Sequence, residues 1–335
     1  MPLPSDNASP QPPRTTDSLI SIVVPSYNEA GNVAVLAEAV SAALAGCNYE
    51  LIFVDDGSSD GTFDEITAVA SRDGRVRGIS LSRNFGHQYA LSAGLRAAAG
   101  QAVIMMDGDL QHPPALLPVM IQKWREGYNV VQGVRQYTTT APYLKRITSD
   151  AFYRVFSALC GIRIEPGMAD FRLLDRRVLD EINAMREGEM FLRGLIAWMG
   201  YKKALVPFEV APRHSGASKD TVRKMLRLAK TGIFAFSSMP LRIGITIGLV
   251  MAGLSFAEFA YVIFAYFAGH SVPGWASMMA VLSLLFGVLF LLVGIQGEYI
   301  VRIYERVQHR PPFLVEREVG RQAASKQGQP NKGKG

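Results

Sequence analysis

The chain has 335 residues, of which 49% are hydrophobic and 19% are charged, and its formal net charge is +6. This length suits one soluble domain of ordinary size together with a small membrane segment. The two cysteines, Cys47 and Cys160, lie outside any CxxC or Cys/His cluster, which argues against a zinc site or a disulfide framework. The positive charge fits nucleic acid, nucleotide diphosphates or anionic lipid headgroups and does not choose between them.

The first 17 residues differ in composition from the rest of the chain. Pro, Ser and Thr are frequent over 1–17, and no apolar run of the kind found in secretory signals occurs there. Such a segment has too few apolar side chains to form a core. We therefore predict a disordered leader over 1–17.

Short apolar runs alternate with amphipathic stretches from residue 18 onward. The apolar runs predict strands at 19–24, 49–54, 75–81 and 101–107. The amphipathic stretches predict helices at 33–45, 63–72 and 87–100. This alternation, with strands that are apolar throughout, predicts an α/β domain whose parallel sheet is covered by helices on both faces. In such sheets ligands bind beyond the carboxyl ends of the strands.

The strongest polar cluster is DGDLQHPP (107–114), which directly follows an apolar strand. Two carboxylates two residues apart, Asp107 and Asp109, can hold a divalent cation that also binds a diphosphate. Gly108 lets the backbone come close to a ligand. A DxD triplet alone is weak evidence, and the strand before it strengthens the interpretation.

Two further polar clusters follow predicted strands. VDDGSSDGT (54–62) places Asp55 and Asp56 at the end of an apolar strand, and its Ser and Gly residues suit the cap of the next helix. Capping does not explain two adjacent carboxylates on that strand. PSYNE (25–29) is by itself only a turn signal. We expect all three clusters to converge at one edge of the sheet.

The C-terminal third contains two long apolar segments, at about 243–268 and 275–297. Each can cross a bilayer, which needs roughly 20 apolar residues. The short connection between them predicts a transmembrane hairpin within 241–300. Basic residues flank the hairpin on both sides and are absent from the connection: Arg213, Lys219, Arg223, Lys224, Arg227, Lys230 and Arg242 before it, and Arg302, Arg306, Arg310 and Arg317 after it. The positive-inside rule then predicts a multi-pass protein of the cytoplasmic (inner) membrane, with the soluble domain and both termini in the cytoplasm.

Three features surround the hairpin. The segment 216–240 predicts amphipathic juxtamembrane helices on the headgroup surface. Residues 301–335 predict a cytoplasmic tail that is disordered at its end. Glu258 lies inside the first span, where a carboxylate is expensive. A functional role and simple packing between helices both stay open for it.

The order of these motifs resembles the GT-A glycosyltransferases of family 2. The segments that carry the resemblance are PSYNE (25–29), DDGSSD (55–60), RNFG (83–86) and DGDLQ (107–111). Later segments narrow it to the polyisoprenyl-phosphate glycosyltransferases, which include dolichol-phosphate mannose synthases and GtrB-type bactoprenol glucosyl transferases. Those segments are ADFRLLD (169–175), FLRGL (191–195), RHSGASK (213–219) and GEYIVRIY (297–304). The similarity covers about 18–316 and implies a GT-A (Rossmann-like) catalytic domain over 18–215, followed by the two-helix transmembrane hairpin.

The resemblance assigns the donor and metal positions. The nucleotide base and ribose are expected at Pro25, Tyr27, Glu29 and Asp56. Asp107 and Asp109 match the DxD, and Gln111 matches a further position around the metal, which is expected to be Mg²⁺ or Mn²⁺. Arg213 and Lys219 match basic residues that reach the donor diphosphate or the acceptor phosphate.

The resemblance also places the acceptor and the catalytic groups. The acceptor phosphate is expected at Arg135, Lys145 and Arg146, and Asp170 stands where inverting relatives keep an acidic residue near the sugar. The expected catalytic group is Asp107, Asp109, Asp170 and Arg213.

Two histidines lie beside these motifs. No partner for His87 is visible in the sequence, so we expect a structural role for it. His112 stands where some relatives have Asp or Asn, and we expect that variation to leave metal binding unchanged.

The resemblance implies an inverting enzyme that moves a sugar from a nucleotide-sugar to undecaprenyl or another polyprenyl phosphate at the cytoplasmic membrane face. Glucose from UDP-glucose is the family-weighted expectation. The acceptor phosphate is already an anionic nucleophile, so orientation and charge neutralisation should provide most of the rate. We predict a single in-line displacement with inversion at the anomeric carbon.

Three other functions fit parts of the sequence. A processive polysaccharide synthase of the same fold would need more spans and a QxxRW-like motif, and neither is evident. A catalytically silent membrane scaffold fits poorly with an intact DxD. A nucleic-acid binder would explain the charge, but the basic residues gather beside the membrane segments. The expected partners are therefore a nucleotide-sugar, a polyprenyl phosphate, the membrane and further copies of the chain, a homo-oligomer that is a tetramer by analogy with relatives.

Overall fold

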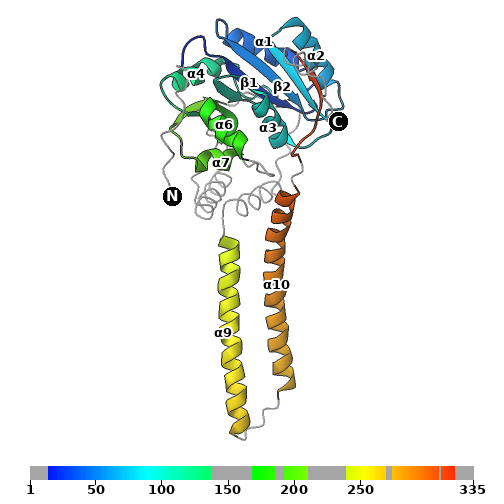
Figure 1. Cartoon of the computed structure of the whole chain (residues 1–335), viewed down its shortest axis with the longest axis vertical. Coiled ribbons are helices and arrows are strands. Elements are labelled where there is room, and N and C mark those ends of the chain that lie inside the picture. Colours follow the sequence, from blue (N-terminus) through cyan, green and yellow to red (C-terminus); the bar gives the residue numbers. More distant parts are fainter. Residues whose placement is uncertain are drawn as a thin grey trace, which may run out of the picture. The chain divides into compact units, whose positions relative to one another are not determined.

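An eight-stranded mixed sheet forms the centre of the larger unit of the protein (Figure 1). The computed structural model describes residues 14–136, 168–185, 192–209, 239–268, 274–308 and 311–320. The sheet has the order β7-β5-β6-β4-β1-β2-β3-β8. Its strands are β1 Ile20–Ser26, β2 Tyr49–Asp55, β3 Val76–Leu81, β4 Ala102–Met105, β5 Val130–Gln136, β6 Met168–Asp175, β7 Lys203–Glu209 and β8 Val315–Val319.

The four neighbouring strands β4, β1, β2 and β3 are parallel, as the sequence predicts. Their side chains are buried on both faces, which explains the unbroken apolar runs. Outside this group the sheet is mixed, because β6 runs antiparallel to β4 and β5, and β8 runs antiparallel to β3. β7 pairs in parallel with β5 and alternates exposed and buried side chains.

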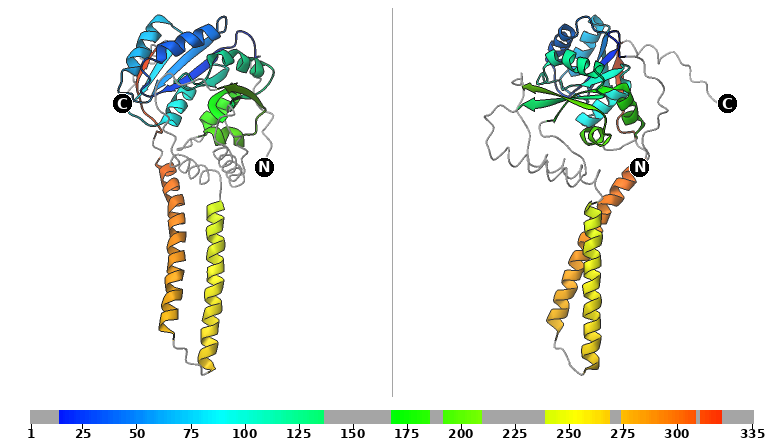
Figure 2. Two further views of the ribbon diagram at one scale, coloured as in Figure 1. Left: turned by 180° about the vertical axis from the view of Figure 1, so that it is seen from behind. Right: turned by 90° about the vertical axis from the view of Figure 1, so that its left-hand side faces the viewer.

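Helices cover both faces of the sheet (Figure 2). The helices of this unit are α1 Val33–Ala43, α2 Thr62–Arg72, α3 His87–Ala97, α4 Leu117–Arg125, α6 Arg176–Ala184 and α7 Leu192–Trp198. On one face, α1, α2 and α4 share an apolar cluster with residues of β1 such as Ile20, Ile22 and Val24. On the opposite face, α3 packs on β1 and β2 and contacts α6.

Close packing fixes the position of α3 on the sheet. At Gly94 an added Cβ would lie 2.3 Å from Val23 Cγ1 and 3.0 Å from Val54 Cγ2. Any larger residue would therefore push α3 away from β1 and β2. Because His87 is the first residue of α3, this contact also sets the position of the helix end that carries it.

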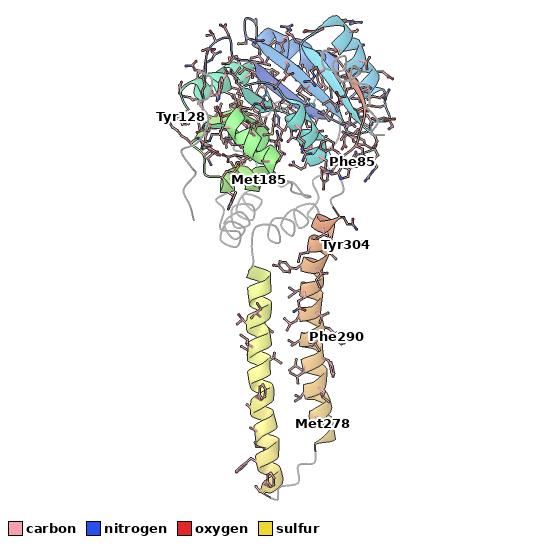
Figure 3. The ribbon with its side chains drawn as sticks, in the orientation of Figure 1. Phe85, Tyr128, Met185, Met278, Phe290 and Tyr304 are labelled. Carbon is pink, nitrogen blue, oxygen red and sulfur yellow. The ribbon has the colours of Figure 1, made fainter. Side chains whose placement is uncertain are left out.

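The second unit contains two long helices in contact with each other, α9 Met239–Phe267 and α10 Trp275–Val307. Leu292 of α10 faces the small residues Gly244 and Gly248, where an added Cβ would lie 3.4 Å from its methyl groups. Large apolar side chains such as Phe290 and Tyr304 are exposed along α10 (Figure 3). In the part of the chain that the structure describes, one helical window, Leu284–Val301, is long and apolar enough to cross a membrane.

The elements agree with the expected order, and the ends of the chain differ from expectation. α9 begins four residues before the predicted span at 243–268, and α10 continues ten residues past the predicted span at 275–297. Part of the expected tail forms β8, which lies at the sheet edge against β3. Arg14, at the end of the expected leader, forms an ion pair with Asp175 at 2.9 Å. Residues 1–13, 216–238 and 321–335 lie outside the described residues, and so does the side chain of Glu258.

Candidate functional site

A pocket of about 330 Å³ lies at the carboxyl ends of β1, β2 and β4. This is the edge at which open α/β sheets bind ligands. Its lining includes six residues that the sequence predicts for the donor and the metal: Pro25, Tyr27, Glu29, Asp56, Asp107 and Asp109. The other lining residues are Ser26, Asn84, Gly86, His87, Ala90 and Gly108. The three polar clusters therefore converge as the alternation of strands and helices predicts.

The loop after β1 is held by the loop after β2. Asn28 adopts a left-handed conformation with φ of 54°. Its backbone N–H donates to Ser58 Oγ at 2.9 Å, and its side-chain oxygen accepts from the N–H of Ser59 at 3.0 Å. The N–H of Glu29 donates to Thr62 Oγ1 at 3.0 Å. These bonds fix the backbone that carries Tyr27, whose side chain is half exposed at the pocket.

Asp56 forms part of the pocket wall and holds the loop after β3. Its two carboxylate oxygens accept the backbone N–H groups of Phe85 at 2.8 Å and Gly86 at 2.9 Å. Burial raises the pKa of Asp56 above its ordinary value, although these two hydrogen bonds oppose the shift. Gly86 has φ of 111° and ψ of 150°, a conformation that is essentially restricted to glycine. Asp56 and Gly86 together direct the chain into α3.

The DxD turn is also fixed by local hydrogen bonds. The N–H of Gln111 donates to Asp109 Oδ1 at 3.1 Å, and the N–H of Asp107 donates to His112 Nδ1 at 3.0 Å. Leu110 between them has φ of 61°, which is uncommon for a residue with a branched side chain. Burial lowers the pKa of His112. The turn thus presents Asp107 and Asp109 to the pocket on a rigid backbone.

His87 connects the DxD to a second acidic residue. Its Nε2 lies 3.6 Å from Asp107 Oδ1 and 3.7 Å from Asp170 Oδ2. Burial alone would lower the pKa of His87, but the nearby carboxylates of Asp170 and Asp107 outweigh it and raise that pKa. The sequence could not show these partners, because Asp170 lies on β6, far along the chain. His87 therefore faces the pocket and is more than a strand-to-helix connection.

Asp170 is surrounded by donors. Arg193 binds both of its oxygens, with Nε 2.8 Å from Oδ1 and Nη2 2.9 Å from Oδ2. Arg172 Nη2 lies 3.2 Å from Oδ1, and Gln88 Nε2 donates to Oδ2 at 3.4 Å. Although burial alone would raise it, the positive charge of Arg193 and these hydrogen bonds hold the pKa of Asp170 well below its ordinary value. Asp170 is therefore an ionised carboxylate whose oxygens are already bound.

The remaining predicted residues are only partly described. Arg135 is the sixth residue of β5 and is partly buried, and it is absent from the pocket lining, as is Gln111. Lys145, Arg146, Arg213 and Lys219 lie outside the described residues. Among the described residues, no group of three His, Cys, Asp or Glu side chains forms a complete metal cage.

The α/β domain of Rossmann-like topology, with carboxylates gathered at the ends of its parallel strands, has the GT-A fold of glycosyltransferases. Residues 21–183 match the family model described as glycosyl transferase family 2. The bactoprenol glucosyl transferase of Shigella phage SfV is 37% identical over 302 residues, covering 89% of this chain and 98% of that protein. The prophage bactoprenol glucosyl transferase homolog of Escherichia coli (strain K12) is 36% identical over 301 residues, covering 89% and 98%.

The chain therefore belongs to glycosyltransferase family 2 and, within it, to the GtrB-type family of bactoprenol glucosyl transferases. A glycosyltransferase of Bacillus subtilis (strain 168), YkcC, is 38% identical over 303 residues, which cover 90% of this chain and 94% of that protein. Among solved structures, glucosyl-3-phosphoglycerate synthase from Mycobacterium tuberculosis in complex with UDP matches with a TM-score of 0.45 and 22% identity, covering 65% of this chain and 79% of that one.

Proposed function

We propose that this glycosyltransferase moves a sugar from a nucleotide-sugar to a polyprenyl phosphate and that glucose from UDP-glucose is its donor. The observation that carries the proposal is the convergence of Tyr27, Glu29 and Asp56 with Asp107 and Asp109 in one pocket. This distribution of groups would fit a base and ribose beside Tyr27, Glu29 and Asp56, with the diphosphate and its cation beside Asp107 and Asp109. The relatives named as bactoprenol glucosyl transferases align along most of the chain and support a lipid-phosphate acceptor.

A divalent cation fits the donor set of this pocket. Asp107 and Asp109 offer hard carboxylate oxygens, which Mg²⁺ and Mn²⁺ prefer. Mg²⁺ is commonly held by one or two carboxylates together with substrate phosphates and water, so a complete protein cage is not required. When bound, such a cation neutralises charge on the donor diphosphate. We propose that Asp107 and Asp109 hold it and that Gln111 contributes from the same turn.

The protein's own residues would then orient the reaction. We propose a single displacement in which a phosphate oxygen of the acceptor bonds to the anomeric carbon as the bond to the donor β-phosphate oxygen breaks, with inversion. An anionic acceptor needs no strong base, and the saturated hydrogen bonding of Asp170 supports a positioning role for that residue. We propose Arg135, Lys145, Arg146, Arg213 and Lys219 as further phosphate-binding residues.

Membrane association follows from the acceptor that we propose. The window Leu284–Val301 has a mean hydropathy of 2.0, and α9 contacts α10. We propose that α9 and α10 cross the cytoplasmic membrane as a hairpin, with the catalytic domain and both termini in the cytoplasm. The basic residues on both flanks of the pair support this orientation. Assembly as a homo-oligomer is part of the same proposal.

The test is a direct assay of the product. Detergent-purified protein is incubated with undecaprenyl phosphate, Mg²⁺ or Mn²⁺ and a panel of nucleotide-sugars, and the lipids are analysed by mass spectrometry. We expect a lipid-phosphate sugar that requires the metal and is lost in Asp109→Ala. Anomeric configuration is then read from the product by NMR, and a retained configuration would contradict the single displacement. Nucleotide binding with no product from any donor would favour a silent scaffold, and a sugar polymer would favour a processive synthase.

A further inference from the structure

His112 is a fully buried side chain directly behind the DxD turn. Its Nδ1 accepts the backbone N–H of Asp107 at 3.0 Å. A ring nitrogen that accepts a hydrogen bond carries no proton, so the neutral imidazole must carry its proton on Nε2. His112 therefore presents an N–H group on the side away from the backbone contact.

That Nε2–H group has no hydrogen-bond partner in the described part of the chain, although it is buried. An acceptor lies close to it on the side chain of Asp107, the residue whose backbone N–H binds Nδ1: Asp107 Oδ2 is 3.6 Å from Nε2. A buried donor without an acceptor is unfavourable, and a small rotation of the Asp107 carboxylate would supply one. The two groups thus stand just outside hydrogen-bond distance.

Aromatic packing prevents the imidazole from making that movement itself. The ring stacks on Phe171 of β6, with centroids 5.0 Å apart and an interplanar angle of 11°. Phe208 of β7 meets it edge-on at 5.7 Å. Because the ring is packed between two strands, we expect the carboxylate of Asp107, which is partly exposed and faces His87 through Oδ1, to be the partner that turns.

We propose that His112 is a positioning residue for the metal-binding carboxylate: its Nε2–H binds Asp107 Oδ2 when the cation and the nucleotide are bound, which leaves Oδ1 for the cation. This inference rests on the proposed function and departs from the expectation that position 112 is neutral for metal binding. Side chains that orient metal ligands commonly change metal affinity about 10- to 100-fold when they are replaced.

The experiment separates the two nitrogens of the ring. In His112→Asn the side-chain oxygen stands near the place of Nδ1 and keeps the acceptor for the Asp107 N–H, but nothing reaches Oδ2. In His112→Gln the amide N–H extends to the place of Nε2, while the near acceptor is lost. His112→Phe keeps the aromatic packing alone. Full-length protein in detergent is titrated with Mn²⁺ at saturating UDP, and free Mn²⁺ is measured by electron paramagnetic resonance.

We expect Mn²⁺ affinity to fall about 10- to 100-fold in the Asn and Phe variants and to stay within about 3-fold of the wild type in the Gln variant. Thermal unfolding without Mn²⁺ and UDP identifies any variant that does not fold. If the Asn variant binds Mn²⁺ as tightly as the wild type, the inference is overturned, whatever the other variants do. Wild-type protein that transfers sugar in EDTA and binds no Mn²⁺ would also overturn it while leaving the transfer reaction intact. Tight Mn²⁺ binding without transfer to the lipid would instead refute the proposed acceptor alone.

Discussion

Arg193 and Asp170 meet in a two-point ion pair, with Nε and Nη2 of the guanidinium 2.8 and 2.9 Å from the two carboxylate oxygens. The pair joins α7 to β6 beside His87, which in turn lies 3.6 Å from Asp107. Arg172, also buried, contacts the same carboxylate. Gln88 lies at this carboxylate as well, so one carboxylate holds four positively charged or polar side chains beside the pocket. Asp170 therefore organises the site even though its own oxygens are occupied.

Replacing Asp170 with Asn should destabilise the fold. The substitution leaves Arg172 buried without its countercharge, and breaking a buried pair typically costs about 3–5 kcal/mol. Urea unfolding at pH 7.5 measures the difference. Asp180→Asn is the matched control, because Asp180 is 62% exposed in its ion pair with Arg176 and should change stability by less than about 1 kcal/mol.

The wild type and the Asp170→Asn variant also give a pH test, because the direction of the Asp170 pKa shift fixes how their difference in stability depends on pH. The pKa of Asp170 is held well below the ordinary 3.8, so the ionised form contributes stability that is fully present above that ordinary value. The contribution is lost only as the pH falls through the lower pKa of the folded state. We expect the stability gap between wild type and Asp170→Asn to be at least as large at pH 5 as at pH 7.5, because Asp170 also raises the pKa of His87, whose contribution is fully present only below its ordinary pKa of 6.5. A gap that closes by pH 5 would mean that the pKa of this carboxylate in the folded protein is raised above its ordinary value instead of lowered.

Asp109→Asn should leave the turn intact and weaken donor binding. The Asn side-chain oxygen can still accept the N–H of Gln111, which Asp109 Oδ1 accepts at 3.1 Å, while the negative charge is removed. We expect an unchanged melting temperature and a loss of about 100-fold or more in sugar transfer, the size typical for loss of one electrostatic contact to the reacting group. Melting temperature, Mn²⁺-dependent UDP binding and product formation are compared in one preparation. Unchanged transfer would show that Asp109 does not act on the donor.

The sequence predicts which residues line the pocket better than it predicts the hydrogen bonds and ion pairs around Asp170. Tyr27, Asp56 and Asp107 each follow an apolar strand, and parallel strands bring their carboxyl ends together, so local patterns suffice to place them. The partners of Asp170 come from α3, β6 and α7, and no periodicity connects those elements. The sequence likewise shows no partner for His87, and it therefore predicts only a structural role for a side chain that faces Asp107 and Asp170.

The sequence also does not predict the outer strands of the sheet, β5, β6, β7 and β8. β5, β6 and β7 pair in an order that differs from their order along the chain, and β8 joins the sheet only after the two long helices of the second unit. Strand propensity marks segments that suit a sheet, while pairing depends on packing against neighbours that lie far away in sequence. The polar strand β8, with the sequence Val-Glu-Arg-Glu-Val, has too few apolar side chains to be recognised as part of a sheet.

Gly94→Ala should displace α3 and disturb the pocket from a distance. The new Cβ would lie 2.3 Å from Val23 Cγ1, and overpacking of this kind costs typically about 1–3 kcal/mol. Because α3 begins at His87, we also expect weaker UDP binding. Gly74→Ala is the control, since no atom lies within 4 Å of its added Cβ. Equal stability of both variants would show that α3 can move without cost.

Val319→Asp tests whether β8 is an integral strand of the catalytic unit. Val319 packs against the core cluster, and its Cγ2 would lie 2.7 Å from a Cβ at Gly78 of β3. A carboxylate at this half-buried position loses part of its hydration, so we expect a loss of about 2 kcal/mol in the free energy of unfolding. Glu316→Gln, at an exposed position of the same strand, should be neutral. The consequence should extend to the pocket, because β3 also carries Ser80, whose hydroxyl donates to Asp55 Oδ2 at 3.1 Å. If the Val319 variant unfolds like the wild type and binds UDP equally well, β8 contributes nothing to the unit that carries the site.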